Sequence, residues 1–143
     1  MKIHMGIVGV LLVTVMESAF GANCVGSPDE NRLNATEISA ALSNKTINAV
    51  APSGEDWKEA HCAGGALYKA GDGTAVDPRA LRGTWSVTGS GNDRTVTYNY
   101  TGGPTYTWSM YQNKTTNVVY FCNGSTEIAR IVSTTNGAGS PCN

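Results

Sequence analysis

The residues that most often carry out acid–base, nucleophilic or metal chemistry are scarce in this sequence. It has two histidines, His4 and His61, and His4 lies in an N-terminal segment that we expect to be removed. One remaining histidine cannot build a multi-histidine metal site, and a catalytic triad would have to use the same residue. Its neighbour Cys62 is expected in a disulfide, and no Gly-x-Ser-x-Gly elbow presents a serine. We therefore interpret His61 as an edge or surface residue of a strand, and predict no catalytic residue, no metal and no cofactor.

Paired carboxylates are the second chemistry to test, because two acids can hydrolyse a glycosidic bond. Glu55, Asp56 and Glu59 form an acidic cluster. On a strand, Asp56 and Glu59 would face opposite sides, and Lys58 between them is typical of a mixed, solvated surface. We interpret the cluster as exposed and non-catalytic.

Four cysteines are present, and an even number favours two disulfides in an oxidising compartment. They are Cys24, Cys62, Cys122 and Cys142. No Cys-x-x-Cys pair occurs, which argues against a zinc or redox site. Three pairings are possible. We favour Cys24 with Cys62 and Cys122 with Cys142, because each terminal cysteine would then tether one end of the mature chain to the sheet.

The N-terminus has the pattern of an export signal. Lys2 precedes an apolar stretch, residues 3–16, that is too short to cross a bilayer, and small residues at Ser18 and Gly21 fit signal peptidase. We predict a signal peptide at residues 1–21, a mature chain from Ala22, and a secreted or periplasmic protein with no stable membrane anchor after cleavage. The alternatives are a lipoprotein cysteine at Cys24, which the preceding Asn23 disfavours, and an uncleaved anchor, which the short length disfavours.

The remaining residues, 22–143, suffice for one domain with its own core but not for two. The net charge of the full sequence is −1, and removing Lys2 and Glu17 with the signal leaves it unchanged. A near-neutral chain without basic clusters lacks the attraction that dominates nucleic-acid binding. We expect a single domain and no nucleic-acid partner.

One short helix is predicted near the start of the mature chain. Asn34 can cap it and Glu37 can complete a capping box. One helix face carries the apolar residues Ile38, Ala41 and Leu42. This helix should pack against a sheet edge or close one end of a barrel.

The clearest strand signal is a hairpin. Residues 95–100 alternate polar and apolar side chains, residues 101–104 form a turn, and residues 105–110 alternate in the same phase. Because successive residues of a strand face opposite sides, hydroxyls should share one face of this hairpin. The other face should carry Val96, Tyr98, Tyr100, Tyr106, Trp108 and Met110.

Further strands are predicted at residues 46–50, 57–62, 66–70, 84–88, 118–122 and 128–133. About eight short strands joined by short turns are typical of an antiparallel meander. Closure into a barrel removes the two unpaired edges that an open sheet would expose. We predict an all-β fold of about eight antiparallel strands closing into a small barrel, with one short N-terminal helix.

Two short segments carry a family resemblance. Gly83-Thr84-Trp85 resembles the Gly-x-Trp motif of lipocalins, and Arg130 on the last predicted strand resembles the late arginine that stacks on that tryptophan in the family. The resemblance covers these two places and implies a lipocalin-like barrel. The general pattern is also similar to that of small exported bacterial domains of unknown function, and of small barrel-shaped inhibitors of lysozyme or proteases.

Aromatic residues are the best candidates for a binding role. Inward positions of a small barrel are usually filled by side chains, so a core role is favoured. In a hollow barrel the ligand-binding residues would be Trp85, Tyr98, Tyr100, Tyr106, Trp108 and Arg130.

Two functions remain open from the sequence. The first is a non-enzymatic binding or inhibitory module that contacts an unknown protein through a surface loop, such as residues 71–82 or 112–117. The second is a carrier of a small apolar ligand in the aromatic interior. A filled interior favours the first function and a hollow one the second.

Overall fold

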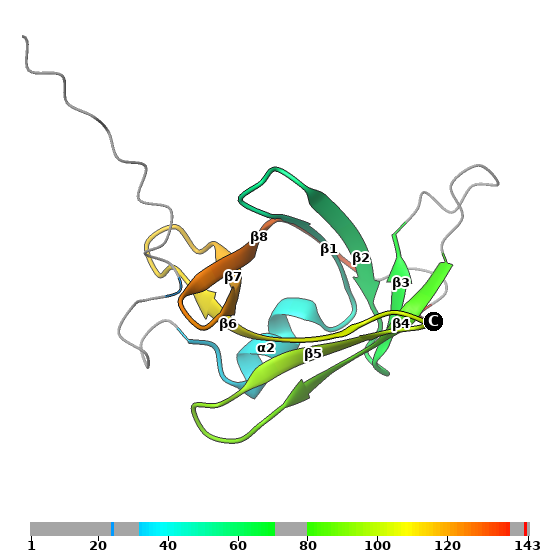
Figure 1. Cartoon of the computed structure of the whole chain (residues 1–143), viewed down its shortest axis with the longest axis horizontal. Coiled ribbons are helices and arrows are strands. Elements are labelled where there is room, and N and C mark those ends of the chain that lie inside the picture. The colour runs from blue at the N-terminus through cyan, green and yellow to red at the C-terminus, as the bar shows by residue number, and fades with distance from the viewer. Residues whose placement is uncertain (1–23, 25–31, 71–79, 138–141, 143) are drawn as a thin grey trace, which may run out of the picture.

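Eight antiparallel strands, each paired with its neighbours along the chain, form a barrel that closes where β1 pairs with β8. The strands are β1 (Lys45–Val50), β2 (Asp56–His61), β3 (Ala66–Lys69), β4 (Ala80–Thr88), β5 (Thr95–Tyr100), β6 (Thr105–Gln112), β7 (Val119–Asn123) and β8 (Thr126–Asn136). Figure 1 shows this ring in the computed structural model, which describes residues 24, 32–70, 80–137 and 142. The predicted eight-stranded antiparallel barrel is confirmed. The predicted signal peptide at residues 1–21 lies outside the described residues.

One helix, α2 (Ala35–Leu42), closes one end of the barrel (Figure 1). Asn34 and Glu37 form the predicted capping box, in which each side chain accepts a hydrogen bond from the other residue's backbone N–H. Ile38 and Leu42 are fully buried and join the barrel core. The helix therefore gains its stability from packing its apolar face on the barrel rather than from its length. We call this end of the barrel the helix end, and the opposite end, with turns 51–55 and 101–104, the rim.

The hairpin of β5 and β6 has the predicted facing. Val96 lies opposite Trp108, and Tyr98 lies opposite Tyr106. Val96 and Tyr98 are buried inside the barrel, whereas the hydroxyl of Thr97 on the outer face contacts the hydroxyls of Thr88 and Thr107. Period-two alternation was sufficient to place these side chains.

The centre of the barrel is filled with side chains. The largest fully buried residues include Ile47, Leu67, Val96, Tyr98, Met110 and Phe121. The rings of Tyr98 and Phe121 meet edge to face with centroids 6.3 Å apart. The pockets among the described residues therefore lie at the two ends of the barrel and on the side of β3 to β5, rather than at its centre.

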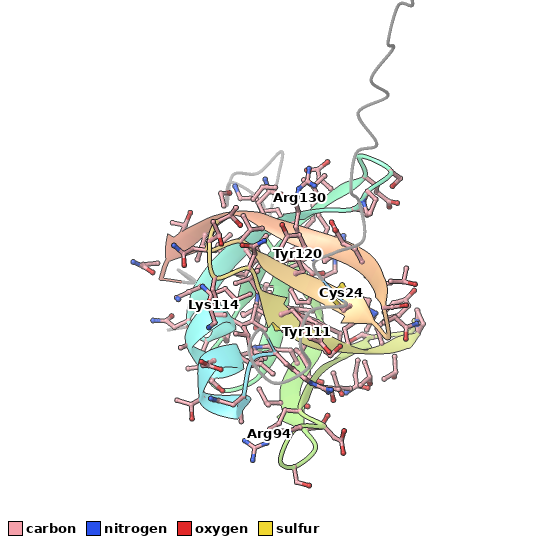
Figure 2. All side chains as sticks on the ribbon, turned by 90° about the vertical axis from the view of Figure 1, so that its left-hand side faces the viewer. Cys24, Arg94, Tyr111, Lys114, Tyr120 and Arg130 are labelled. Atoms are coloured by element: carbon pink, nitrogen blue, oxygen red, sulfur yellow. A yellow bond between two sulfur atoms is a disulfide. The ribbon has the colours of Figure 1, made fainter. Side chains whose placement is uncertain are left out.

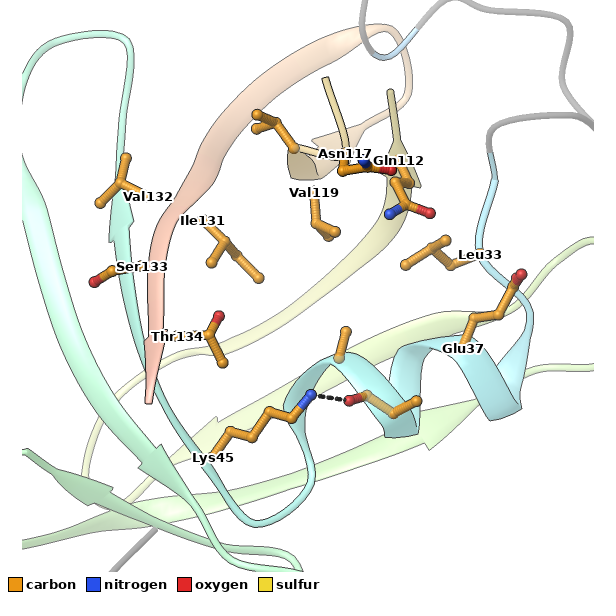
Figure 3. A pocket seen from close by; sticks show the side chains of 13 residues that line it. Leu33, Glu37, Lys45, Gln112, Asn117, Val119, Ile131, Val132, Ser133 and Thr134 are labelled. Carbon is orange, nitrogen blue, oxygen red and sulfur yellow. Dashed lines mark hydrogen bonds between the residues drawn. The ribbon is translucent and has the colours of Figure 1, made fainter. Parts of the chain in front are cut away.

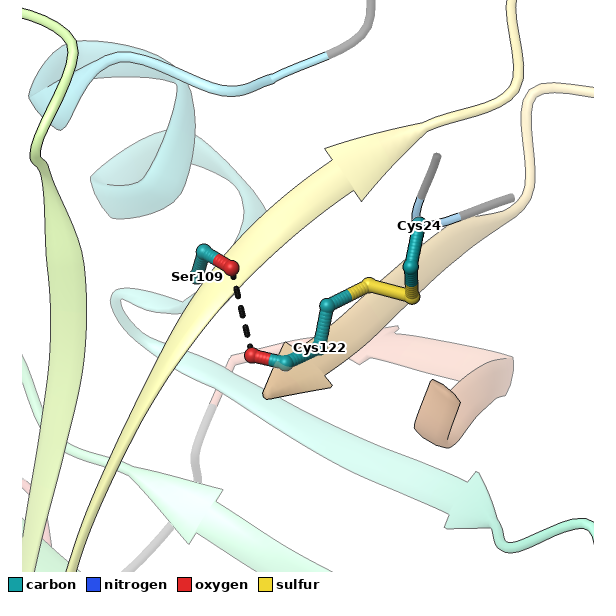
Figure 4. Close-up of a disulfide and its surroundings, with 3 residues drawn as sticks. All are labelled: Cys24, Ser109 and Cys122. Atoms are coloured by element: carbon teal, nitrogen blue, oxygen red, sulfur yellow. Dashed lines mark hydrogen bonds between the residues drawn. A yellow bond between two sulfur atoms is a disulfide. The ribbon is translucent and has the colours of Figure 1, made fainter. Parts of the chain in front are cut away.

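A second apolar cluster lies on the outer face of β6 and β7. Tyr111, Tyr120 and Cys122 point outward there and are covered by Cys24. Figure 2 shows Cys24 with Tyr111 and Tyr120 on this face, and Figure 4 shows the Cys24–Cys122 disulfide lying over β7, where the hydroxyl of Ser109 donates to the carbonyl of Cys122. Cys24 is thus fixed to the outside of the barrel.

The favoured disulfide pairing was wrong. Cys24 is bonded to Cys122 and Cys62 to Cys142, across sequence separations of 98 and 80 residues. The pairing by proximity along the chain failed because the barrel brings distant strands together. Cys62 follows β2 at the helix end, where β8 also ends. In a chain-entropy treatment, loops of this size contribute about 4.5 kcal/mol each, more than the short loops we had favoured.

The described residues include neither a membrane-spanning helix nor a cluster of metal-binding side chains. No helix among them has the length and apolar character needed to cross a membrane. No three histidine, cysteine, aspartate or glutamate side chains gather as metal ligands within residues 24, 32–70, 80–137 and 142.

Candidate functional site

The inner face of β2 carries three side chains with polar or aromatic chemistry. Trp57 pairs with Ala49, Glu59 with Ile47, and His61 with Lys45 on β1. Because Ala49 and Ile47 face the core, their cross-strand partners face the core too. From the rim to the helix end, β2 thus presents Trp57, Glu59 and His61 to the barrel interior.

His61 is fully buried, so its interpretation as an edge or surface residue was wrong. Its Nε2 lies 3.0 Å from the hydroxyl of Tyr98 in a hydrogen bond, and its ring meets those of Trp85 and Tyr98 edge to face. Burial lowers the pKa of His61 from 6.5 to about 4, although the backbone carbonyls of Glu59 and Lys45 act in the opposite direction. His61 is therefore neutral near pH 7 and acts as a structural polar group in the core.

Glu59 is also buried, with 7% of its surface exposed, so the predicted solvated surface was wrong for this residue. The hydroxyl of Tyr100 donates to both of its carboxylate oxygens, at 3.0 and 3.1 Å. Burial raises the pKa of Glu59 from 4.5 to about 7, while the hydrogen bond from Tyr100 and the positive charge of Arg82 act to lower it. Glu59 therefore changes its charge near neutral pH.

A connected set of aromatic rings lies at the rim, and one of them, Tyr100, contacts this acid. Trp57 lies 6.3 Å from Trp108, Trp108 stacks on Tyr106 at 5.2 Å, and Tyr106 meets Tyr100 edge to face at 6.0 Å, all between ring centroids. Tyr106 is 42% exposed, and Trp57, Tyr100 and Trp108 are partly buried. The rings at the rim thus combine apolar surface with access to solvent.

A pocket of about 410 Å³ opens beside this ring cluster, and we call it the rim pocket. Its walls include Trp57, Glu59, Lys69, Arg82 and Tyr100. The volume lies in the range of small-molecule sites, and a few polar groups converge on apolar walls. The rim pocket therefore combines space, aromatic surface and an ionisable acid.

Local backbone geometry places Arg82 and Tyr100 at this pocket. Leu67 pairs with Gly83 but Tyr68 pairs with Leu81, so Arg82 is the extra residue of a β-bulge. Such bulges often change the direction of side chains next to functional sites. At Gly83 the backbone of β5 approaches so closely that a Cβ atom would lie 1.9 Å from the carbonyl oxygen of Asn99. Glycine is therefore required next to the bulge, and it allows β4 to approach the Tyr100 region of β5.

The helix end has a larger pocket, of about 600 Å³, between α2 and strands β6 to β8 (Figure 3). Leu33, Val119 and Ile131 point into it. Two of its charged groups are engaged locally, because Glu37 belongs to the capping box and the Lys45 ammonium donates to the carbonyl of Ala40. Perturbed ionisable groups mark functional sites more often than satisfied ones, so the rim pocket is the stronger candidate.

The six sequence-predicted ligand residues do not form one site. Tyr100, Tyr106 and Trp108 lie at the rim, and Tyr98 is buried beneath them with 1% of its surface exposed. Trp85 faces inward near the helix end, where its indole N–H donates to the carbonyl of Cys62 at 3.0 Å.

Arg130 lies outside the barrel. It pairs with Tyr120, next to the inward pair of Phe121 and Ala129, and therefore faces outward beside Tyr120 (Figure 2). The stacking of Arg130 on Trp85 that the lipocalin resemblance implied is absent from the described residues. The Gly-x-Trp tripeptide itself stands on the fourth strand of the barrel.

The six predicted ligand residues did not include the rim-pocket residues Trp57, Glu59, Lys69 and Arg82. The alternation of Trp57, Glu59 and His61 could have placed the first two on one face of β2, since they are two residues apart. No local sequence pattern predicts that Arg82 lies at the rim pocket, because its position depends on the β-bulge.

Comparisons with known proteins give no relative from which a site could be transferred. No protein-family model matches the chain, and no curated protein and no solved structure matches it significantly. The function is therefore inferred from the geometry of this chain.

Proposed function

We propose that the protein is an exported, non-enzymatic binding module that holds a small ligand in the rim pocket. The observation that carries the proposal is the contact of the buried Glu59 carboxylate with the partly buried Tyr100 hydroxyl. The two residues line a small-molecule-sized pocket beside partly exposed aromatic rings. Rings supply apolar contact, and the acid and its hydroxyl partner supply directional hydrogen bonds.

Export is supported by two lines of evidence. Both disulfides are formed, and all four cysteines of the chain take part in them, which is consistent with an oxidising compartment. The apolar segment at residues 3–16, after Lys2, supplies the expected signal. We therefore propose a secreted or periplasmic location.

A binding role is favoured over catalysis by the placement of the ionisable groups. General acid–base chemistry needs a group that reaches the ligand. Glu59 borders the rim pocket, but His61 is fully buried below it and bonded to Tyr98. The neutral His61 thus stabilises the core. It does not reach the pocket, where it could have exchanged a proton together with Glu59.

The experiment is an NMR screen of the mature protein, residues 22–143, with a set of small aromatic compounds. Ligands in the rim pocket should shift the indole N–H signal of Trp57 and the amide signal of Lys69, and leave the indole signal of Trp85 in place. Replacing the wall residue Trp57 by alanine should weaken binding, followed at the Lys69 amide, while the dispersed spectrum is retained, and Thr97→Ser serves as the control. Shifts confined to Val119 and Ile131 would assign binding to the helix end and contradict the proposal.

A second candidate function is the contact of a protein partner through the loop after β6. The side-chain oxygen of Asn113 accepts hydrogen bonds from the backbone of Thr115 and Thr116, both at 3.0 Å, and the backbone of Asn117 donates to the Asn113 carbonyl. This loop is therefore preorganised and exposes Lys114 (Figure 2). Most of the other predicted loop, residues 71–82, lies outside the described residues.

A further inference from the structure

The described residues of the rim pocket carry more positive than negative charges. Arg82, Lys69 and Lys58 contribute three positive charges to its lining, and Asp56 contributes one negative charge. Glu59 is the second acid, and it is buried while Arg82 is exposed. Among the described residues, the lining of the pocket therefore carries a net positive charge whether Glu59 is neutral or ionised.

The apolar wall has a fixed position relative to these cations. Trp57 and Tyr100 line the same pocket, and Tyr100 stacks on the buried ring of Tyr98 with an interplanar angle of 14°. A planar ring can pack on this wall, while guanidinium and ammonium groups at the pocket edge can bind a carboxylate. A cationic ligand would have to approach Arg82 and Lys69 against their charge.

We propose that the rim pocket selects a small aromatic monoanion, with its ring against Trp57 and Tyr100 and its carboxylate at Arg82 and Lys69. This inference rests on the proposed function and names the ligand class for the same site. Arginine is suited to this role because its planar guanidinium can donate two parallel hydrogen bonds to one carboxylate.

The protonation of Glu59 should make the affinity for an anionic ligand depend on pH. The ionisable groups around it are His61 on its own strand, Lys69 on β3, Arg82 on β4, and Tyr98 and Tyr100 on β5. Burial lowers the pKa of His61 and raises the pKa of both tyrosines, so these three are neutral near pH 7. An ionised Glu59 would repel a bound carboxylate, so binding should proceed with uptake of one proton from solvent onto Glu59.

The test uses three probes of similar size that differ in charge: phenylacetate, phenethyl alcohol and phenethylamine. Each is titrated into the mature protein and followed by the NMR signals of Trp57 and Lys69. At pH 6 we expect phenylacetate to bind most tightly and phenethylamine most weakly. Because one proton is taken up, the affinity for phenylacetate should fall about tenfold between pH 6 and pH 8, whereas that for the neutral alcohol should stay constant.

Two variants separate the charge contributions. Glu59→Gln should keep the affinity for phenylacetate and lose its pH dependence. Arg82→Gln should weaken phenylacetate about tenfold and leave phenethyl alcohol unchanged. Lys114→Gln removes one positive charge from the loop at the helix end and is the matched control, with no expected effect on either probe.

The outcomes distinguish this inference from the proposed function. Two results would overturn the monoanion assignment while leaving a ligand site at the rim. One is tighter binding of phenethylamine than of phenylacetate, and the other is loss of phenylacetate binding in Glu59→Gln. Equal affinity of all three probes would do the same. If none of the probes shifts rim signals, and the wider aromatic screen also fails there, both proposals are wrong.

Discussion

The Tyr100 hydroxyl on β5 donates hydrogen bonds to both carboxylate oxygens of Glu59 on β2, at 3.0 and 3.1 Å. Strands β3 and β4 stand between these two strands in the barrel order, so the contact spans the interior rather than one ladder. The contact joins the β5–β6 hairpin to β2 at the rim. A polar contact of this kind fixes the position of a buried ionisable group and leaves it responsive to pH.

The pH dependence of stability should change in Glu59→Gln. The pKa of Glu59 is raised on folding, so its contribution is greatest below pH 4.5 and about 3 kcal/mol of it is lost as the pH rises through 7. The pKa of His61 is lowered, so its contribution is full above pH 6.5 and is lost as the pH falls toward 4. These two effects oppose each other between pH 4.5 and 6.5.

Urea unfolding at several pH values measures this balance. Wild-type stability should change little between pH 6.5 and 4.5 through these groups. Glu59→Gln should lose about 2 to 3 kcal/mol over the same interval, because the His61 contribution is then unopposed. Identical pH profiles for the two proteins would show that Glu59 titrates at its ordinary value in the folded state.

Tyr98→Ser should destabilise the barrel by about 2 to 4 kcal/mol, because a fully buried ring is replaced by a cavity and His61 loses its hydrogen-bond partner. Thr97→Ser, one residue away on the outer face, keeps its hydroxyl and should change the free energy of unfolding by under about 1 kcal/mol. Chemical denaturation of both variants checks the prediction. Equal losses would contradict the inward placement of Tyr98.

Gly83→Ala should destabilise strongly, by about 2 kcal/mol or more, since the new methyl group would meet the backbone of Asn99 and β4 would have to move away from β5. Gly64→Ala is the matched control, because nothing lies within 4 Å of its Cβ position and its φ is not positive. That control should be neutral or slightly stabilising. A fully tolerated Gly83→Ala would mean that the close approach of β4 and β5 is wrong.

Peptide mapping without reduction tests the disulfides. The intact oxidised chain should be four hydrogens lighter than the reduced chain, as expected for two bonds. Linked peptides should join Cys24 to Cys122 and Cys62 to Cys142. A Cys24–Cys62 peptide in folded, exported protein would restore the pairing that sequence proximity favours.

Local pattern was enough for the fold but not for the site. The capping box at Asn34 and the alternation of β5 and β6 are encoded within a few residues, so the helix and the facing of Tyr98 followed from the sequence. The disulfide pairing was missed because it depends on how the barrel closes.

The site was missed for a related reason. Glu59 and His61 are polar residues that face inward, against the usual pattern, and their partners Tyr100 and Tyr98 are 41 and 37 residues away. Hydrophobic periodicity assigns such residues to the surface, because it ignores hydrogen bonds that only the folded barrel supplies. Buried polar residues of this kind often mark functional positions.

The pKa of Glu59 tests the central claim most directly. It is measured by following the carboxyl carbon signals of protein labelled at glutamate, from pH 3 to pH 9, with Glu59→Gln to assign the signal. A midpoint near 7 is expected, because burial at the rim pocket disfavours the charged form more than Tyr100 and Arg82 favour it. A midpoint near 4.5 would contradict the buried acid, and with it the site on which the proposed function depends.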